Sequence, residues 1–164
     1  MIKAEPIGVI HSPFKKPEGM PIQPIQAGGA EGIVEVKPEF SEGLKDLQDF
    51  ERIWLIYWFD RVSETKLIVK PFRDNVLRGL FSTRTPCRPN PIGLSAVRLL
   101  RIEETKLYVA DIDVLDGTPL LDIKPYIPEF DSFEDSRCGW MQNLRGKISP
   151  ADDRFYEKRD NQRG

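Results

Sequence analysis

The chain has 164 residues, of which 40% are hydrophobic and 30% are charged, and its formal net charge at pH 7 is −2. This balance is typical of a single globular domain. The longest apolar run, Ile53–Phe59, is too short to span a membrane, and the first residues lack the apolar segment of a secretory signal. We therefore expect a cytoplasmic protein with no membrane segment.

Metal and thiol chemistry find little support in the sequence. The two cysteines, Cys87 and Cys138, lie far apart, and His11 is the single histidine. This spacing matches no metal ligand set and no cysteine–histidine pair for nucleophilic catalysis. The glycine-rich nucleotide-binding motifs and the serine hydrolase motif are also absent from the sequence. We expect no metal, and any cofactor must be held by another kind of site.

Charge is distributed unevenly along the chain. Residues 61–101 contain nine lysines or arginines and two acidic residues, whereas residues 102–135 contain two basic residues and ten acidic ones. A basic face on a nearly neutral protein suits a polyanion or a nucleotide phosphate. Alternatively, the two blocks pair with each other in the fold, since charged runs usually form solvated faces.

The first third of the chain predicts strands separated by a long loop. Residues 2–10 partly alternate and contain a proline, which favours an edge strand. Residues 13–31 contain four prolines and predict a loop without regular structure. Residues 32–37 alternate as a strand. Residues 41–48 predict a short amphipathic helix with Ser41 as its N-cap.

The middle of the chain contains the clearest strand signals. Residues 53–59 are aromatic, β-branched and apolar on both faces, which predicts a central buried strand with Tyr57 in the core. Residues 79–83 predict a strand that leads into a proline-rich loop. Residues 94–102 and 106–112 alternate on either side of a tight connection and predict a β-hairpin.

The proline-rich loop carries Pro86, Pro89 and Pro91 around two polar side chains, Arg88 and Asn90. Proline fixes φ and favours an extended conformation in the residue before it, so the loop is stiff. Binding residues are often found on loops held by a rigid scaffold, which makes this loop a candidate site. The alternative is an ordinary proline-rich turn.

Several short strands, one short helix and many turn residues together predict an all-β fold. We expect a small single-domain β-barrel with long loops, formed by residues 1–140. Residues 141–164 are dense in charge and predict a polar C-terminal extension, either packed or frayed.

Four stretches of the chain, in this order, resemble the TsaA-like family, whose characterised type is TrmO: Ile7–Phe14, Phe50–Leu55, Phe81–Ser95 and Asp116–Tyr126. The resemblance implies a β-barrel that binds S-adenosylmethionine, usually as a homodimer. It also implies a methyltransferase acting on N6 of the threonylcarbamoyl-adenosine next to the tRNA anticodon. Bacterial members carry a further C-terminal domain, whereas this sequence ends soon after the expected barrel.

The resemblance places the cofactor contacts on loops and strand ends: Pro21, Ile22, Gln23, Asp60, Arg61, Arg84, Leu94, Asp116, Gly117, Thr118 and Pro119. Two positions depart from the family pattern. Ile22 stands in the middle of a Pro-Arg-Gln pattern, and Asp60-Arg61 stands where bacterial members have His-Gln.

Methyl transfer to an exocyclic nitrogen requires a group that accepts a proton, and the candidates are Asn90 and Asp122. Arg88 and Lys124 are candidates for substrate phosphate, and Tyr126 for base stacking. Surface packing is the alternative for Lys124 and Tyr126. Two other functions stay open: a barrel that binds S-adenosylmethionine or a nucleotide without catalysis, and an RNA-binding barrel.

Overall fold

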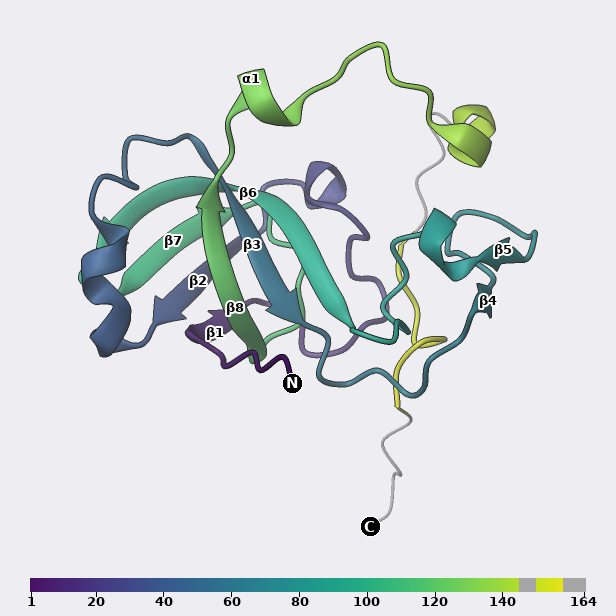
Figure 1. The fold of residues 1–164 in the computed structure, drawn as a ribbon, viewed down its shortest axis with the longest axis horizontal. Helices are drawn as coiled ribbons and strands as arrows, with labels where there is room; N and C mark the ends of the chain where they lie inside the picture. The colour runs from purple at the N-terminus through teal and green to yellow at the C-terminus, as the bar shows by residue number, and fades with distance from the viewer. Residues whose placement is uncertain (145–149, 158–164) are drawn as a thin grey trace.

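The computed structural model describes residues 1–144 and 150–157, and its centre is a closed antiparallel barrel. The strand order around the barrel is β1-β2-β7-β6-β3-β8 (Figure 1). The bounds are β1 Gly8–His11, β2 Glu31–Val36, β3 Arg52–Trp58, β6 Ile92–Glu103, β7 Lys106–Ala110 and β8 Thr118–Pro125. The short strand β1 pairs with both β2 and β8, which closes the sheet. The all-β barrel prediction is confirmed.

The barrel interior is filled by alternate side chains of each strand. In β3, Ile53, Leu55 and Tyr57 are buried, whereas Trp54 and Ile56 are only partly buried. The prediction of a strand buried on both faces is therefore wrong, because a barrel strand turns every second residue outward. Tyr57 lies in the core as predicted. The N-terminal strand is likewise no edge strand, since β1 has two neighbours.

The region 38–50 forms a 3₁₀ helix, η2 (Pro38–Leu44), in place of the predicted α-helix at 41–48. Ser41 lies inside η2, not at its N-cap, and Asp46 beyond it has a positive φ of 65°. Leu44, Leu47 and Phe50 give the apolar spacing that predicted an α-helix. Leu44 ends η2 and the other two follow it, and all three pack against the barrel.

Between β3 and β6 the chain leaves the barrel and forms a small subregion. It contains the two-stranded pair β4 (Ile68–Val69) and β5 (Arg78–Gly79), followed by the 3₁₀ helix η3 (Leu80–Ser82). The prediction of a strand over 79–83 is thus wrong beyond Gly79. The predicted hairpin is confirmed as β6 and β7, whose connection includes Glu104 with a φ of 54°.

The remaining elements are short. The 3₁₀ helix η1 (Pro24–Gln26) lies within the predicted first loop, while α1 (Pro128–Asp131) and the 3₁₀ helix η4 (Gly139–Leu144) follow β8. In Figure 1 this last stretch runs over the top of the barrel toward the β4–β5 side. Over the described ranges, 1–144 and 150–157, no helix has the length and apolarity needed to cross a membrane.

Residues 150–157 pack back onto the domain. Ala151 forms two backbone hydrogen bonds with the first loop: Gly19 N donates to Ala151 O and Ala151 N donates to Met20 O, both at 2.9 Å. Phe155 is buried beside Val69, Leu80 and Cys87. This part of the predicted C-terminal extension is therefore packed, and the parts at 145–149 and 158–164 lie outside the described residues.

Candidate functional site

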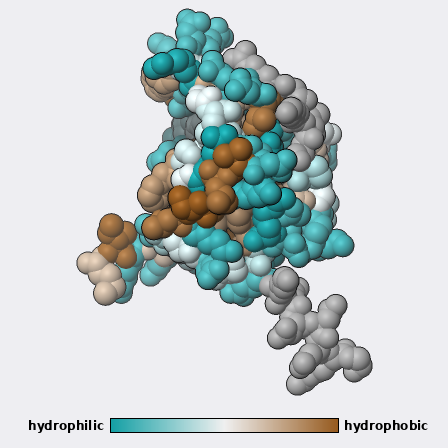
Figure 2. Space-filling model, turned by 90° about the vertical axis from the view of Figure 1, so that its right-hand side faces the viewer, coloured by the Kyte–Doolittle hydropathy of each residue, from teal (hydrophilic) through white to brown (hydrophobic). Residues whose placement is uncertain are grey.

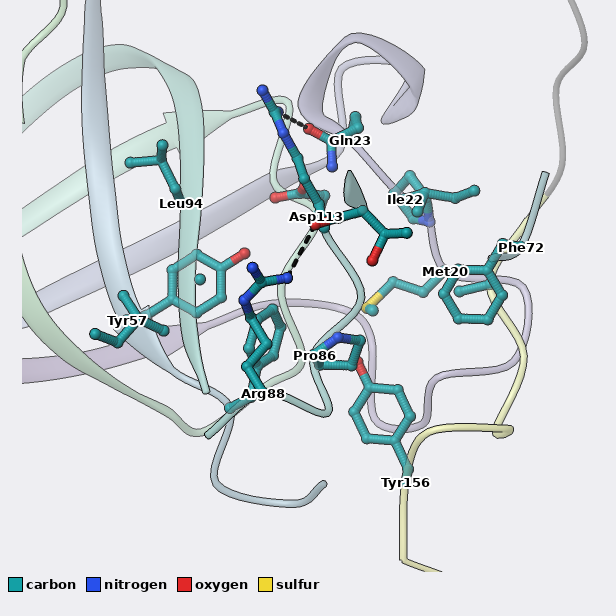
Figure 3. A pocket seen from close by; sticks show the side chains of 17 residues that line it. Met20, Ile22, Gln23, Tyr57, Phe72, Pro86, Arg88, Leu94, Asp113 and Tyr156 are labelled. Carbon is teal, nitrogen blue, oxygen red and sulfur yellow. Dashed lines mark hydrogen bonds between the residues drawn. The ribbon is translucent and has the colours of Figure 1, made fainter. Parts of the chain in front are cut away.

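A cavity of about 240 Å³, here called the inner cavity, lies where β3 ends and β6 begins. Loop 20–23 and the proline-rich loop form its walls, together with residues of the packed C-terminal segment (Figure 3). Five of the predicted cofactor residues line it: Pro21, Ile22, Gln23, Arg84 and Leu94. The predicted substrate residue Arg88 lines it as well. The structure thus brings together residues from six separate parts of the sequence: 20–23, 57–59, 72, 83–94, 113 and 151–156.

The proline-rich loop is held rigidly at this cavity. Pro86 and Pro91 are buried, and Phe59 N donates a hydrogen bond of 2.7 Å to Pro91 O. The guanidinium of Arg88 turns back on its own loop, where Nη1 donates to Thr83 O at 2.9 Å. Its carbon Cζ lies 5.6 Å from the centre of the Phe81 ring. Arg88 therefore fixes the shape of the loop, in addition to lining the cavity.

Arg84 and Gln23 form a link across the mouth of the inner cavity. Arg84 Nη1 donates to Gln23 Oε1 at 2.8 Å, drawn as a dashed line at Gln23 in Figure 3. The two residues come from loops 61 positions apart in the chain. Because Arg84 is largely exposed, its remaining N–H groups are available to an anionic group.

Three hydrogen-bonded side chains are buried at the inner cavity: Tyr57 of β3, Ser95 of β6 and Asp113, which lies between β7 and β8. Ser95 Oγ donates to Asp113 Oδ1 at 2.6 Å, so Tyr57 Oη, at 3.0 Å from Ser95 Oγ, is the donor to that hydroxyl. Gly93 allows the Tyr57 ring to lie against β6, since a Cβ there would be 2.1 Å from a ring carbon. Asp113 and Tyr57 both face the cavity.

Burial raises the pKa of Asp113 to about 7, although the hydrogen bond from Ser95 and the charge of Arg84 act in the opposite direction. Burial, together with the nearby Asp113, also holds the pKa of Tyr57 well above its ordinary value. Burial raises the pKa of Tyr156, another lining residue, to about 12. A carboxyl group with such a pKa, placed in a cavity, is a candidate functional group.

Asp113 was not among the predicted site residues. In the sequence it is one of the ten acidic residues of the block 102–135. Its immediate neighbours Ile112 and Val114 are apolar and buried. A carboxyl group enclosed by apolar residues was the one available signal, because buried acids are rare unless they are paired. Met20 and Tyr156 were missed as well, and nothing in their local sequence marks them.

Asp60, Arg61 and Thr118 lie in a small recess beside the inner cavity. Arg61 connects the other two, since Nε donates to Asp60 Oδ1 at 3.1 Å and Nη2 donates to Thr118 Oγ1 at 3.0 Å. The recess encloses about 10 Å³, roughly the room that one water molecule needs. It shares Asp113 and Tyr156 with the inner cavity.

The rest of the Asp116–Pro119 turn contacts the N-terminal segment. Asp116 accepts a hydrogen bond of 2.9 Å from Ser12 N and forms an ion pair of 2.5 Å with Lys15 Nζ. Lys15 therefore holds the pKa of Asp116 below its usual value. Gly117 has a φ of 81° and Pro119 faces Val9 of β1. Neither cavity described so far includes Asp116, Gly117 or Pro119.

Four other predicted residues do not line the inner cavity. Asn90 is exposed on the proline-rich loop. Asp122 and Lys124 pair with each other at 2.9 Å on β8, opposite Ile56 and Trp54, the β3 residues that turn away from the barrel interior, and neither lines the cavity. Tyr126 packs edge-on against Trp54, with ring centres 5.4 Å apart. These contacts are compatible with surface packing, and the substrate roles of Lys124 and Tyr126 stay predictions.

The two charged blocks pair only in part. Asp111 of the acidic block binds Arg98 Nε at 3.1 Å, and also Arg52, which precedes the basic block. Arg84 and Arg88 make their hydrogen bonds to Gln23 and to loop carbonyls instead. Within the described parts of the chain, no three histidine, cysteine or acidic residues gather as metal ligands.

Comparison with known proteins places this arrangement in a family. The model of the tRNA-methyltransferase O N-terminal domain matches residues 9–132. A probable S-adenosyl-L-methionine-binding protein of Pyrococcus abyssi is 52% identical over 158 residues, covering 95% of this chain and 86% of that protein. The tRNA (adenine(37)-N6)-methyltransferase of Homo sapiens is 38% identical over 137 residues, covering 78% of this chain.

Among solved structures, TrmO from Pseudomonas aeruginosa matches with a TM-score of 0.73 and 39% identity over 85% of this chain. The chain spans 62% of that protein and 31% of the human enzyme. The family match covers most of the barrel, both of its cavity-lining loops and the polar chain around Asp113. This protein therefore belongs to the tRNA-methyltransferase O N-terminal domain family, the TsaA-like family that its four sequence stretches resemble.

Proposed function

We propose that this protein is an S-adenosylmethionine-dependent methyltransferase acting on N6 of the modified adenosine next to the tRNA anticodon. The observation that carries the proposal is the inner cavity, where loop 20–23, Arg84 and Leu94 meet the buried carboxyl group of Asp113. Relatives named for binding S-adenosyl-L-methionine and for methylating adenine 37 of tRNA support the cofactor and the substrate class respectively.

The residues present fit such a cofactor. S-adenosylmethionine supplies an electrophilic methyl group on a positively charged sulfonium, next to an amino acid moiety and an adenosine. Arg84 would hold the carboxylate, because its guanidinium is exposed at the cavity mouth. Asp113 would face a positive charge of the cofactor. Met20, Phe72 and Leu94 offer apolar surface to the remaining groups.

The function of Asp113 follows from its burial. A buried carboxylate is costly without a cationic partner, and the raised pKa of about 7 reflects that cost. A cation in the cavity would favour the ionised form, so cofactor binding below pH 7 should release a proton from Asp113. The hydrogen bond from Ser95 keeps Oδ1 in place in either state.

The chain contributes to the reaction mainly by positioning. The acceptor nitrogen must form a bond to the methyl carbon while the carbon–sulfur bond breaks and S-adenosylhomocysteine leaves, and the proton of that nitrogen must pass to solvent. Asn90, exposed on the same rigid loop as Arg88, remains a candidate to accept a hydrogen bond from that N–H group. Asp122 lies opposite the outward-facing Ile56 and does not line the cavity of its own chain, so its participation would need a second copy in a homodimer.

Transfer of a labelled methyl group from S-adenosylmethionine to tRNA tests the proposal. We expect label in tRNA that contains threonylcarbamoyl-adenosine and none in tRNA that lacks adenosine at that position. Absence of label from every tRNA, with the cofactor bound in calorimetry, would overturn the proposed methyl transfer.

Arg84→Ala tests the cofactor site separately. Loss of a hydrogen bond to a charged group costs about 1.5–3 kcal/mol, so S-adenosylmethionine should bind roughly 10- to 100-fold more weakly. Arg101→Ala is the matched control, because Arg101 is an exposed arginine whose guanidinium pairs with Glu103 on the hairpin. Equal calorimetric affinities of both variants would contradict the assignment of Arg84.

A second candidate is a barrel that binds S-adenosylmethionine without transferring its methyl group. It is favoured by the Pyrococcus abyssi relative, which shares 52% identity and is named only as a probable S-adenosyl-L-methionine-binding protein. The two candidates agree on cofactor binding and differ only in the labelled product.

A further inference from the structure

The family match ends at residue 132, yet residues that follow it line cavities of this protein. Trp140 and Met141 of η4 border a second cavity of about 490 Å³, here called the outer cavity, which shares part of its wall with the inner one. The β4–β5 side of the molecule, which faces the viewer in Figure 2, shows a hydrophobic band bordered by hydrophilic residues. Farther along the chain, Ala151 and Tyr156 line the inner cavity. Residues beyond the matched domain therefore contribute to the walls of both cavities.

Tyr156 is held firmly at the inner cavity. Its backbone pairs with Val62 in an isolated antiparallel bridge, and the next residue, Glu157, donates from its backbone N to Arg61 O at 3.1 Å. Its ring packs against two clusters of buried apolar residues, one of which contains Phe155. A side chain that is fixed on both sides in this way presents its polar end in a defined place.

The hydroxyl group of Tyr156 is open to a ligand. In Figure 3 the ring rises from the segment 150–157 toward the centre of the cavity, and none of the other side chains drawn, all from the described residues, forms a hydrogen bond with its hydroxyl group. Burial raises the pKa of Tyr156 to about 12, so the hydroxyl group keeps its proton at neutral pH. Its oxygen can still accept a hydrogen bond from a bound cation.

Asp113 and Tyr156 border the same space. Both line the inner cavity and the small recess beside it, and the charge of Asp113 contributes to the raised pKa of Tyr156. The recess side is occupied by Arg61, which donates to Asp60 and Thr118 there. Because the charge of Arg61 repels a second cation, a cation that meets both Asp113 and Tyr156 must lie on the side of the inner cavity.

The groups around this space suit a cationic ligand. The carboxyl group of Asp113 supplies negative charge when it ionises, and the oxygen of Tyr156 supplies a neutral acceptor. The rings of Phe59, Phe72 and Tyr156 line the same cavity, and aromatic faces attract cations. S-adenosylmethionine carries two cationic groups, the ammonium of its amino acid moiety and the sulfonium.

We propose that Tyr156 is a cofactor-binding residue, whose hydroxyl group acts with the carboxyl group of Asp113 to hold a cationic group of S-adenosylmethionine. The inference rests on the proposed function for the identity of the cofactor and not for the transfer of the methyl group. It adds to the site a residue that lies outside the matched domain and outside the contacts that the family resemblance implies.

Calorimetry with Tyr156→Phe tests the inference, because this change removes the hydroxyl group and keeps the ring and its packing. We expect S-adenosylmethionine to bind roughly 10-fold more weakly or worse, as for the loss of a hydrogen bond to a charged group. Tyr108→Phe is the matched control, since Tyr108 lies on β7 under the Arg101 guanidinium and outside both cavities. Equal affinities of the two variants for S-adenosylmethionine would overturn the proposal.

Two analogues show which cationic group is held and separate direct contact from distortion of the cavity. S-adenosylhomocysteine keeps the ammonium and lacks the sulfonium, whereas 5′-methylthioadenosine lacks both. Equal weakening of S-adenosylmethionine and S-adenosylhomocysteine by Tyr156→Phe supports contact with the ammonium, and weakening of S-adenosylmethionine alone supports contact with the sulfonium. Binding of 5′-methylthioadenosine should not change. If it weakens as much as S-adenosylmethionine does, Tyr156 only shapes the cavity and the proposal fails.

Transfer of a labelled methyl group separates this inference from the proposed function. If tRNA is methylated while Tyr156→Phe binds S-adenosylmethionine as Tyr108→Phe does, the inference fails and the proposed function stands. If Tyr156→Phe weakens cofactor binding as expected while the natural protein methylates no tRNA, the assignment of Tyr156 stands and the methyltransferase proposal fails.

Discussion

Asp113 is the residue whose chemistry differs most from what its sequence position suggests. Its carboxyl group lies at the floor of the inner cavity and accepts a hydrogen bond from Ser95. Burial raises its pKa from the ordinary 3.8 to about 7. The neutral carboxyl group is therefore the form that the fold itself favours, and a cationic ligand would reverse that preference.

This pKa predicts how stability depends on pH. Between about pH 4 and pH 7 the folded protein holds a proton on Asp113 that the unfolded chain has released. The stabilisation by this proton is fully present below about pH 4 and is lost as the pH rises through about 7. The loss is of the order of a few kcal/mol, given about 1.4 kcal/mol for each unit of pKa.

Asp113→Asn keeps the shape of the side chain and removes its titration. We expect the free energy of unfolding of the variant to change less between pH 5 and pH 8 than that of the natural protein. Urea denaturation at both pH values, without cofactor, measures the difference. If the two proteins respond to pH in parallel, Asp113 does not titrate in this range.

Position 93 requires a glycine because the Tyr57 ring lies directly against it. A Cβ at this position would be 2.1 Å from the Tyr57 ring, and the ring is buried and hydrogen-bonded to Ser95. We therefore expect Gly93→Ala to destabilise the fold by about 1–3 kcal/mol, the usual cost of overpacking. Gly43→Ala is the control, because a Cβ there meets nothing within 4 Å. Thermal unfolding of both variants checks the prediction, and a Gly93→Ala variant as stable as Gly43→Ala would contradict it.

Among the secondary-structure elements, those that depend on residues close together in the sequence were predicted correctly. The β6–β7 hairpin follows from alternation on both sides of a short connection, and the proline-rich loop follows from the conformational limits of proline. The helix prediction at 41–48 failed because Leu44, Leu47 and Phe50 have helical spacing, but Leu44 ends the 3₁₀ helix η2 and the other two pack against the barrel from outside any helix. Local spacing alone does not distinguish these two origins.

The inner cavity itself depends on contacts between distant residues. Tyr57 and Ser95 meet through the pairing of β3 with β6, Asp113 reaches them from the segment after β7, and loop 20–23 lies against the same cavity. The resemblance to a known family selected Arg84, Leu94 and loop 20–23 correctly as neighbours in space. It also placed Asp116 near a ligand, which stays a prediction; in the structure Asp116 pairs with Lys15.

The packed segment 150–157 joins the barrel to the β4–β5 subregion. Phe155 is 4% exposed and packs edge-on against Phe72, with ring centres 5.1 Å apart, and Phe72 lines both cavities. Phe155→Ala should destabilise the protein by about 3 kcal/mol, as large-to-small changes in a core do. It should also weaken ligand binding at both cavities by loosening Phe72. Urea denaturation and calorimetry check the two effects, with Phe133→Ala as the exposed control; a variant that unfolds like this control would show that the segment adds little.

The whole molecule has two unlike ends, and the two cavities lie at one of them. In Figure 1, η2 lies at one end of the molecule and the β4–β5 subregion at the other. Both cavities border that subregion and are lined by Arg73, Arg84 and Arg88 of the basic block, whereas Arg98 and Arg101 lie on β6. The net charge is only −2, but positive charge gathers at the end of the molecule that carries the cavities. That end is suited to a polyanion.

This asymmetry predicts how binding of tRNA depends on salt. Contacts between basic side chains and phosphates release counterions, so affinity should fall steeply as salt is raised from 50 to 200 mM, while S-adenosylmethionine binding should change little. Lys70 is exposed beside Pro71, which lines the outer cavity, and Lys45 is exposed next to η2 at the other end.

Lys70→Ala should therefore weaken tRNA binding and lower the slope of log affinity against log salt by about 1, as expected for the loss of one phosphate contact. Lys45→Ala removes the same charge from the opposite end of the molecule and should leave the slope unchanged. Filter binding or fluorescence anisotropy at four salt concentrations measures both slopes. The two variants have the same net charge and differ only in where on the barrel the positive charge is removed. Equal slopes for the two variants would therefore mean that tRNA approaches another face.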